Sequence, residues 1–223
     1  MRLVLLDCDG TLVDSQQAIV VAMTAAWQAA GLQAPDPQAV RRAVSLPLTE
    51  AIARLLPGGE SWFVKRLAGL YRDAYYRERH HKGHELEPLY PGVHEALIAM
   101  RASGLSLGIA TGKSFRGLIA VLEQHGLSET FVTLQTADRG LGKPNPDMVF
   151  QALEETCSTS ADTVVVGDST FDMEMACRAG VSGVGVAWGY HSVRDLEAAG
   201  ARRIVHRWED LPRVVLDVMD GKL

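Results

Sequence analysis

The sequence predicts an α/β protein built on a doubly wound parallel sheet, with an α-helical domain inserted after the first strand. Short, continuously apolar runs alternate along the chain with amphipathic segments of helical period, as in buried parallel strands joined by crossover helices. One stretch of roughly 70 residues breaks this alternation and contains only helical patterns. Aspartates follow two of the apolar runs, at the ends of strands where such sheets place their ligand crevice.

Six apolar runs supply the strands of the predicted sheet. They are continuous rather than alternating in polarity, which is typical of strands covered by helices on both faces. The runs are Arg2–Leu6, Leu105–Ala110, Phe131–Leu134, Thr163–Val166, Val181–Val186 and a short edge strand at Arg203–Val205. Helices are predicted near residues 92–103, 114–125, 146–157, 170–180, 192–200 and 211–219.

The inserted segment begins at Ser15, directly after the first strand and its turn. Its helical patterns cover residues 15–30, 37–44, 48–56 and 60–80, and prolines and glycines separate them. A stretch of this length cannot be a plain loop in a compact domain. We therefore expect a core made of residues 1–14 and 86–223, and an inserted helical domain of residues 15–85.

Charge and composition favour a small-molecule partner. The net charge is -5 and no run of Lys or Arg occurs, which disfavours nucleic acid or an anionic membrane as the partner. The N-terminal apolar run stops at Asp7, too early for a signal peptide, and nowhere do about 18 apolar residues follow one another, so we expect a cytoplasmic protein. The three cysteines are far apart and predict neither a disulfide framework nor a zinc site.

Two pairs of aspartates follow predicted strands. Residues two apart in an extended backbone point the same way, so Asp7 and Asp9 should project together beyond the first strand. Asp168 and Asp172 follow the strand that ends at Val166, and the carboxyl ends of parallel strands share one edge of the sheet. A solvated turn for the first pair, and a helix N-cap with a first-turn acid for the second, are the simpler alternatives. The coincidence of both pairs at strand ends favours a common site.

Four carboxylates in one crevice predict a metal ion. Their charge would be about -4, and a set of oxygen ligands without His or Cys suits a hard divalent cation such as Mg²⁺. We therefore expect Mg²⁺ as the cofactor. Lys143, in the stretch GKPNPD, is the candidate for a balancing positive charge, because the prolines around it restrict the backbone. A surface lysine in a proline-rich turn is the alternative.

The stretch GIATGKS, residues 108–114, looks at first like a nucleotide-binding loop. That loop needs four residues between its first glycine and the GK pair, and only three are present. The stretch predicts instead the end of a strand and a helix that begins near Ser114, with Thr111 and Gly112 at the junction. Free N–H groups and the helix dipole favour an anion at such a junction.

Four motifs, DCDGTLVDS, ATGKS, GKPNPD and GDSTFDMEMACRAG, occur in that order at the ends of predicted strands. They resemble the motifs of the haloacid dehalogenase superfamily, and within it the phosphoglycolate-phosphatase-like branch, over essentially the whole chain. The resemblance implies a Rossmann-like catalytic core, a helical cap formed by the inserted domain, and a Mg²⁺-dependent phosphatase. Such an enzyme hydrolyses a small phosphate monoester through an aspartyl-phosphate.

The resemblance also implies roles for individual residues. Asp7 would be the nucleophile, and Asp9 would be the general acid and then the general base. Mg²⁺ would be held by Asp7, the backbone carbonyl of Asp9 and Asp168, with Asp172 assisting. The groups that would bind the phosphoryl oxygens are Thr111, the N–H of Gly112 and Lys143.

The inserted domain departs from the family at one position. Residues 41–48, RRAVSLPL, resemble the substrate-facing loop of the cap, but Ser45 stands where many relatives have glycine. This difference bears on the backbone shape of the loop and therefore on a phosphoglycolate assignment. Arg41 or Arg42 is a candidate contact for a substrate anion, with a solvated arginine pair as the alternative.

Other functions share parts of this pattern. A sugar-phosphate mutase of the same superfamily keeps the same acids and differs in its cap. A phospho-accepting signalling domain also combines Asp, Thr and Lys on a doubly wound sheet, but it would be about half this length. The partner expected in the first two cases is a small phosphorylated metabolite, and the protein would be a monomer or a homodimer.

Overall fold

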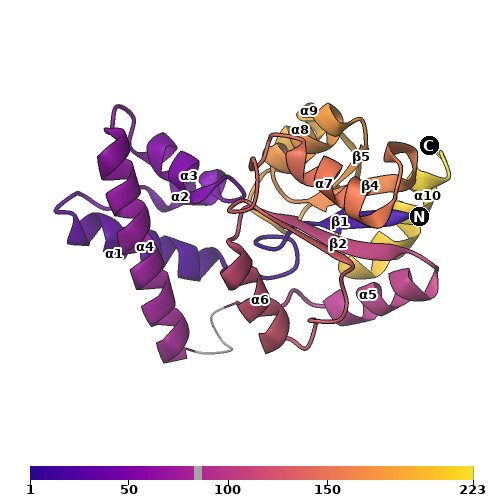
Figure 1. The fold of residues 1–223 in the computed structure, drawn as a ribbon, viewed down its shortest axis with the longest axis horizontal. Coiled ribbons are helices and arrows are strands. Elements are labelled where there is room, and N and C mark those ends of the chain that lie inside the picture. Colours follow the sequence, from indigo (N-terminus) through magenta and orange to yellow (C-terminus); the bar gives the residue numbers. More distant parts are fainter. Residues whose placement is uncertain (83–86, 223) are drawn as a thin grey trace.

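The computed structural model describes residues 1–82 and 87–222 and has a parallel sheet at its centre (Figure 1). The strands are β1 (Leu3–Leu6), β2 (Ser106–Thr111), β3 (Thr133–Thr136), β4 (Thr163–Gly167), β5 (Ser182–Val186) and β6 (Ala201–Val205). Their order in the sheet is β3-β2-β1-β4-β5-β6, and every pairing is parallel. The chain therefore winds outward from β1 in both directions, and the carboxyl end of β1 is the switch point where ligands bind in such sheets.

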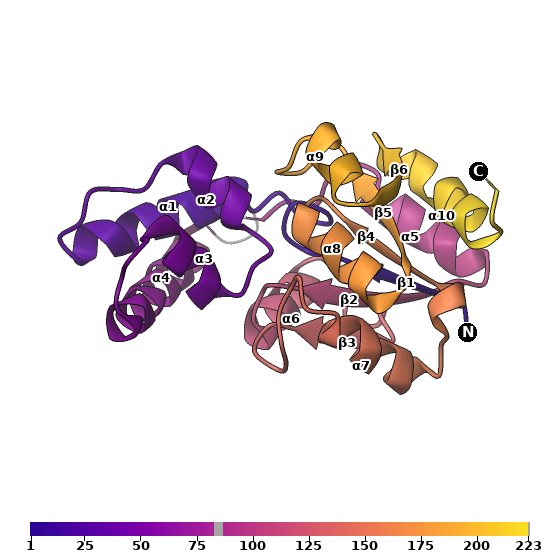
Figure 2. The same cartoon turned by 90° about the horizontal axis from the view of Figure 1, so that it is seen from above.

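Helices cover both faces of the sheet, as the continuous apolar runs predict (Figure 2). One face is covered by α5 (Val93–Ala102), α6 (Phe115–Gln124) and α10 (Leu211–Met219). The other is covered by α7 (Asp147–Thr156), α8 (Thr170–Ala179) and α9 (Val193–Ala198). Two short 3-10 turns, Ser160–Asp162 and Trp208–Asp210, lie in the connections. The predicted doubly wound α/β fold is confirmed.

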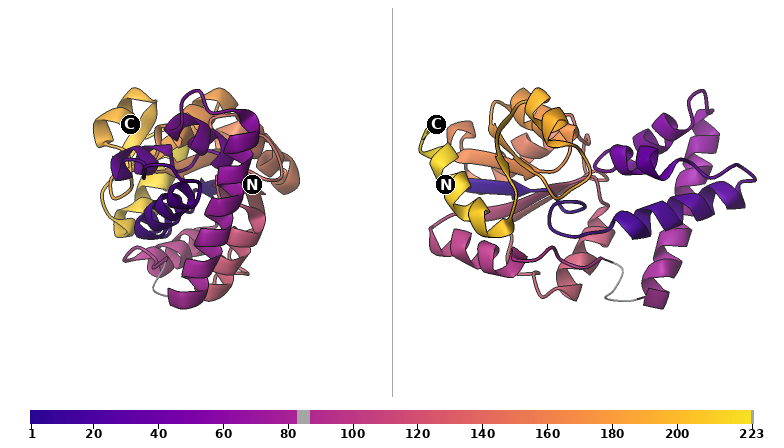
Figure 3. Two further views of the ribbon diagram at one scale, coloured as in Figure 1. Left: turned by 90° about the vertical axis from the view of Figure 1, so that its left-hand side faces the viewer. Right: turned by 180° about the vertical axis from the view of Figure 1, so that it is seen from behind.

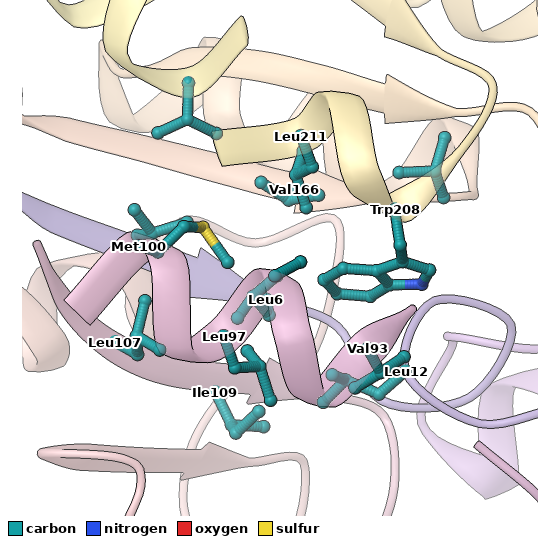
Figure 4. Close-up of a cluster of buried hydrophobic side chains, with 14 of the residues drawn as sticks. Leu6, Leu12, Val93, Leu97, Met100, Leu107, Ile109, Val166, Trp208 and Leu211 are labelled. Carbon is teal, nitrogen blue, oxygen red and sulfur yellow. The ribbon is translucent and has the colours of Figure 1, made fainter. Parts of the chain in front are cut away.

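Alternation along β1 divides the core into two layers. Leu3 and Leu5 pack with α7 and α8, whereas Val4 and Leu6 pack on the opposite face, because successive side chains of a strand point to opposite sides. On that second face, Leu6 lies among side chains from α5 and from the Trp208 segment (Figure 4). Both faces of β1 are thus fully buried, which explains why its apolar run is continuous.

Four helices between β1 and α5 form a separate helical unit, residues 16–82, which stands beside the carboxyl ends of the strands (Figure 3). Its helices are α1 (Gln16–Ala29), α2 (Pro37–Ala43), α3 (Leu48–Leu55) and α4 (Ser61–Lys82). They pack around their own apolar cluster, which includes Trp27, Ile52 and Leu67. The start of α2 is defined by Asp36, whose carboxylate accepts hydrogen bonds from the first free N–H groups, and by Pro37 in the first turn.

One predicted strand is misplaced. The third strand covers Thr133–Thr136 and not Phe131–Leu134. Phe131 is partly buried against the core just before the strand begins, while the buried amide of Gln135 donates to the hydroxyl of Thr133, 2.8 Å away. The polar residues of β3 give no apolar signal, because side-chain hydrogen bonds allow them to be buried.

The domain boundary, the cysteines and the absence of a membrane span are the remaining expectations about the fold. The predicted boundary between residues 85 and 86 lies outside the described residues. All three cysteines are free thiols. Within residues 1–82 and 87–222, no helix has both the length and the apolar composition needed to span a bilayer.

Two residues on α5 provide a test of the packing. Met100 is fully buried between α5 and the sheet, so replacing it with alanine should lower the free energy of unfolding by about 2–5 kcal/mol. Ile98 lies on the same helix but is 68% exposed, so Ile98→Ala should change it by about 0.5 kcal/mol or less. Urea unfolding followed by circular dichroism measures both, and equal losses would contradict this packing of α5.

Candidate active site

The loop after β1 places Asp7 and Asp9 at the switch point. The backbone N–H of Asp7 donates to the carbonyl of Val166 at 2.9 Å, so the residue continues the pairing of β1 with β4. Gly10 then turns the chain with φ of 84°, in the left-handed region that favours glycine. A Cβ at Gly10 would lie 2.4 Å from a carboxylate oxygen of Asp168, so this position must lack a side chain.

Three buried carboxylates meet at this point. Asp7, Asp168 and Asp172 each place an oxygen within 4.8 Å of the others. Asp168 accepts hydrogen bonds from the Thr11 hydroxyl at 3.0 Å and from the Tyr190 N–H at 2.8 Å. The convergence follows from the topology, because β1 and β4 are neighbours and both pairs of aspartates follow their carboxyl ends.

Asp172 has a structural role as well. It forms a capping box with Ser169 at the start of α8, as its position in the first turn of a helix suggests. This bond occupies Oδ2 of Asp172, while Oδ1 lies 2.6 Å from the Nζ of Lys143. Asp172 is therefore both the first-turn acid of α8 and a member of the carboxylate cluster, so the two interpretations of this residue are compatible.

Lys143 is the buried cation of this site. Its Nζ lies 2.9 Å from Oδ1 of Asp7 and 2.6 Å from Oδ1 of Asp172, and its side chain is completely buried. The following peptide bond, to Pro144, is cis. Burial alone would lower the pKa of Lys143, but the charges of Asp172 and Asp7 raise it above its ordinary value. The ammonium group therefore stays protonated.

The negative charge of the cluster is only partly balanced. Burial raises the pKa of Asp168 well above its ordinary value, and the charges of Asp7 and Asp172 raise it further. Burial also raises the pKa of Asp7, although Lys143 opposes this. Three carboxylates and one ammonium leave a formal charge of about -2. An oxygen-lined, buried group with this excess charge fits a hard divalent cation such as Mg²⁺.

Asp9 faces a different group of side chains. Its carboxylate is not part of the three-carboxylate cluster found among the described residues. Its Oδ1 lies 2.9 Å from the Nζ of Lys113, which also lies 2.8 Å from Glu87. Glu87 in turn accepts hydrogen bonds from Tyr75 and Arg79, both on α4. Asp9 is thus connected through two side chains to the helical unit.

The ATGKS segment forms the predicted strand-to-helix junction. Thr111 ends β2 with a buried hydroxyl that accepts a hydrogen bond from the N–H of Lys113 at 3.2 Å. Ser114 is the N-cap of α6, as expected. Thr111 and Gly112 lie at the same edge of the sheet as Asp7, because β2 pairs directly with β1.

The loop between α2 and α3 reaches the carboxylate cluster. The hydroxyl of Ser45 donates to Oδ2 of Asp7 at 2.8 Å. Arg41 and Arg42 lie in the last turn of α2: Arg42 is exposed and 3.9 Å from Asp36, and neither arginine is among the residues that line the cavity beside Asp9. A contact of Arg41 or Arg42 with a substrate anion stays a prediction.

A cavity of about 1090 Å³ lies between the helical unit and the core. Asp9, Ser45, Gly112 and Lys113 line it next to the carboxylate cluster. Its wall on the helical unit is largely apolar or aromatic and includes Ile19, Met23, Val40, Val44, Tyr71 and Tyr75. A ligand that reached Asp7 through this cavity would place its remaining atoms against that wall.

Sequence reasoning missed several residues of the site. Tyr190 binds Asp168 through its backbone, and a Cβ at Gly189 would lie 2.1 Å from the Cβ of Asp168. Both follow β5, so the rule that located the aspartates at strand ends could have found them. Lys113 stands in the sequence only as part of an incomplete nucleotide-binding motif. Nothing in the sequence distinguishes Glu87 from other polar residues of a connection.

The fold and the site define an α/β protein with three buried carboxylates and a buried lysine at the switch point of a parallel sheet. Comparison with known proteins then identifies the family. The family model described as haloacid dehalogenase-like hydrolase matches residues 4–186, and the chain belongs to this family.

Individual relatives agree with this assignment. The chain is 33% identical to the protein named "Probable phosphatase IndB" of Dickeya dadantii, over 94% of this chain and 91% of that protein. It is 29% identical to a phosphoglycolate phosphatase of Vibrio parahaemolyticus, over 96% of each chain. The crystal structure of a "predicted phosphatase" from Clostridium acetobutylicum superposes with a TM-score of 0.87 and 26% identity, over 97% of this chain and 98% of that one.

Cation binding can be tested without an activity assay. Mg²⁺ at about 100 times its Kd should raise the free energy of unfolding by about 2.7 kcal/mol, because the ion binds only the folded cluster. Asp168→Asn removes one buried carboxylate and should abolish most of this increase, whereas Glu129→Gln, at an exposed position, should preserve it. Thermal unfolding with and without MgCl₂ measures the effect. Equal stabilisation of both variants would show that the ion binds elsewhere.

Proposed function

We propose that this protein is a Mg²⁺-dependent phosphatase that hydrolyses a small-molecule phosphate monoester through an aspartyl-phosphate on Asp7. One observation carries the proposal: Asp7 lies in the buried carboxylate cluster, in contact with Lys143, while Asp9 faces the adjoining cavity. The names of the relatives, phosphatase and phosphoglycolate phosphatase, support the same reaction class.

The first half of the reaction forms the covalent intermediate. A carboxylate oxygen of Asp7 attacks phosphorus, and the bond from phosphorus to the leaving oxygen breaks. Asp9 gives its proton to that oxygen, so that the product leaves as a neutral alcohol. Lys143, the hydroxyl of Thr111 and the N–H of Gly112 bind the phosphoryl oxygens and hold the group in line with Asp7.

The second half regenerates the enzyme. Asp9, now ionised, takes a proton from water, and the water oxygen attacks phosphorus as the bond to Asp7 breaks. Phosphate is released and the Asp7 carboxylate is restored. The residues that would hold Mg²⁺ are Asp7, Asp168, Asp172 and the backbone carbonyl of Asp9. The ion would neutralise phosphoryl charge that the carboxylates otherwise repel.

The helical unit fits the role of a cap. We propose that residues 15–85 form a cap domain over a core of residues 1–14 and 86–223. Its apolar cluster is separate from those of the core, and it supplies one wall of the cavity. An enclosed site excludes bulk water, which strengthens the electrostatic interactions that stabilise phosphoryl transfer.

The cavity bears on the choice of substrate. Phosphoglycolate is the first candidate because of the named relatives. Its carboxylate would need a cation; Lys113 is bound to Asp9 and Glu87 and Arg79 to Glu87, so Arg72 or Arg116, which also line the cavity, would have to supply it. The largely apolar wall favours a second candidate, the phosphate ester of a larger uncharged alcohol. A sugar-phosphate mutase remains the alternative reaction.

Substitution of the nucleophile tests the mechanism. Asp7→Asn should lower kcat for phosphate release by about 1000-fold or more, because the amide cannot form the covalent intermediate. Asp14→Asn makes the same change in an exposed residue of the same loop and should retain activity. Phosphate release by both purified variants, with circular dichroism as a check on folding, measures the difference. Undiminished turnover by Asp7→Asn would place the nucleophile elsewhere.

A substrate panel tests the cavity argument and the alternative reaction together. We expect kcat/KM for p-nitrophenyl phosphate to exceed that for 2-phosphoglycolate by about tenfold, which corresponds to about 1.4 kcal/mol of differential transition-state binding. A clear preference for 2-phosphoglycolate would contradict the cavity argument and favour the candidate that the named relatives suggest. With glucose 1-phosphate, the appearance of glucose 6-phosphate instead of free phosphate would indicate a mutase.

A further inference from the structure

Ser45 brings the helical unit into direct contact with the proposed nucleophile. Its side chain is buried, 5% exposed, and its hydroxyl donates to Oδ2 of Asp7 at 2.8 Å. The other oxygen of Asp7, Oδ1, accepts a hydrogen bond from the N–H of Cys8 and lies 2.9 Å from Lys143. The two oxygens of Asp7 therefore have different partners, one set from the core and one from the helical unit.

The backbone at Ser45 is costly for a serine. Its φ is 77°, in the left-handed region, where a residue with a Cβ costs about 1 kcal/mol or more relative to glycine. Glycine would avoid that cost. The chain keeps a hydroxyl here despite the cost, and the hydroxyl is the part of the side chain that contacts Asp7.

The loop that carries Ser45 is seated closely on the core. A Cβ at Gly112 would lie 2.6 Å from the carbonyl oxygen of Ser45. A Cβ at Gly142 would lie 2.2 Å from the Cγ of Pro47. Two core glycines thus leave room for this loop, and they lie next to Thr111 and Lys143, respectively. The loop joins α2 to α3 on the side of the helical unit that faces the core (Figures 1 and 2).

Ser45 also lines the cavity that contains Asp9. Its hydroxyl is therefore at the boundary between the proposed nucleophile and the space available for the leaving group. In the proposed reaction, the phosphoryl group must occupy this boundary. A hydroxyl at this place must then move away from Asp7 Oδ2 or bind the phosphoryl group instead.

We propose that Ser45 is a further catalytic residue, whose hydroxyl donates to Asp7 in the empty site and to a phosphoryl oxygen once the phosphate ester is bound. This inference rests on the proposed phosphatase function. A donor on Oδ2 weakens that oxygen as a nucleophile, so transferring the hydrogen bond to the substrate frees Asp7. The same hydrogen bond then stabilises charge that develops on the phosphoryl group in the transition state.

Two substitutions separate the hydroxyl from the backbone. Ser45→Ala removes the hydroxyl but keeps a Cβ at positive φ, whereas Ser45→Gly removes the hydroxyl and also relieves the backbone. We expect both variants to lose about 100-fold in kcat, the effect of one lost transition-state donor, with KM changed by less than about threefold. Ser45→Gly relieves the backbone but loses the hydrogen bond to Asp7, so its urea unfolding midpoint and circular dichroism are measured beside kcat to show that the assayed protein is folded.

Inhibitor binding distinguishes a catalytic role from a structural one. Orthovanadate resembles the five-coordinate transition state, so its inhibition constant in Ser45→Gly should rise by about the same factor as kcat falls. The inhibition constant of inorganic phosphate, a product, should change by less than about threefold. Parallel and equal changes for both inhibitors would overturn the proposal, because they would indicate a ground-state contact only.

The outcome also separates this inference from the proposed function. If Ser45→Gly retains the kcat of the parent while Asp7→Asn is inactive, the phosphatase mechanism stands and the role of Ser45 is wrong. If the parent protein releases no phosphate from any ester of the panel, the proposed function itself is wrong. A loss of kcat in both Ser45 variants, with the vanadate effect, supports the catalytic role.

Discussion

The structure depends on keeping three carboxylates together inside the protein with only one ammonium group among them. Asp7, Asp168 and Asp172 are fully or nearly fully buried, and Lys143 compensates only part of their charge. Burial of unpaired charge is expensive, so these oxygens need donors from nearby elements. Backbone N–H groups, hydroxyls and the start of α8 all donate to them. Burial is the main cause that raises the pKa values of Asp7 and Asp168, and the neighbouring carboxylates raise them further.

The site is shared between the sheet and the helical unit. The Ser45 hydroxyl contacts Asp7 directly, while Tyr75 and Arg79 reach Asp9 through Glu87 and Lys113. Both aspartates of the first motif are therefore connected to helices that lie outside the core. A displacement of the helical unit would break both connections, since the partners on its side belong to α4 and to the loop between α2 and α3. The arrangement of the two acids and the position of the helical unit are thus physically linked.

Much of the fold and of the carboxylate cluster followed from local patterns. Continuous apolar runs predicted β1, β2, β4 and β5 closely, because strands buried on both faces need apolar side chains at every position. The meeting of Asp7 with Asp168 followed from parallel topology, which brings strand ends to one edge. The third strand was misplaced by two residues because Gln135 and Thr136 are buried through hydrogen bonds, and polar strand residues give no apolar signal.

The sequence by itself determined the fold class, the family and the residue types at the switch point, since these depend on periodicity and on motifs within short stretches of chain. Only the tertiary structure decided which side chains surround those residues. The contact of Ser45 with Asp7 spans 38 residues, and that of Lys113 with Glu87 spans 26. The first contact depends on how the helical unit packs against the core, and the second on how the connection before α5 lies against the end of β2; no local pattern encodes either. The residues that line the cavity, and therefore the substrates it can accept, also depend on how the helical unit packs against the core.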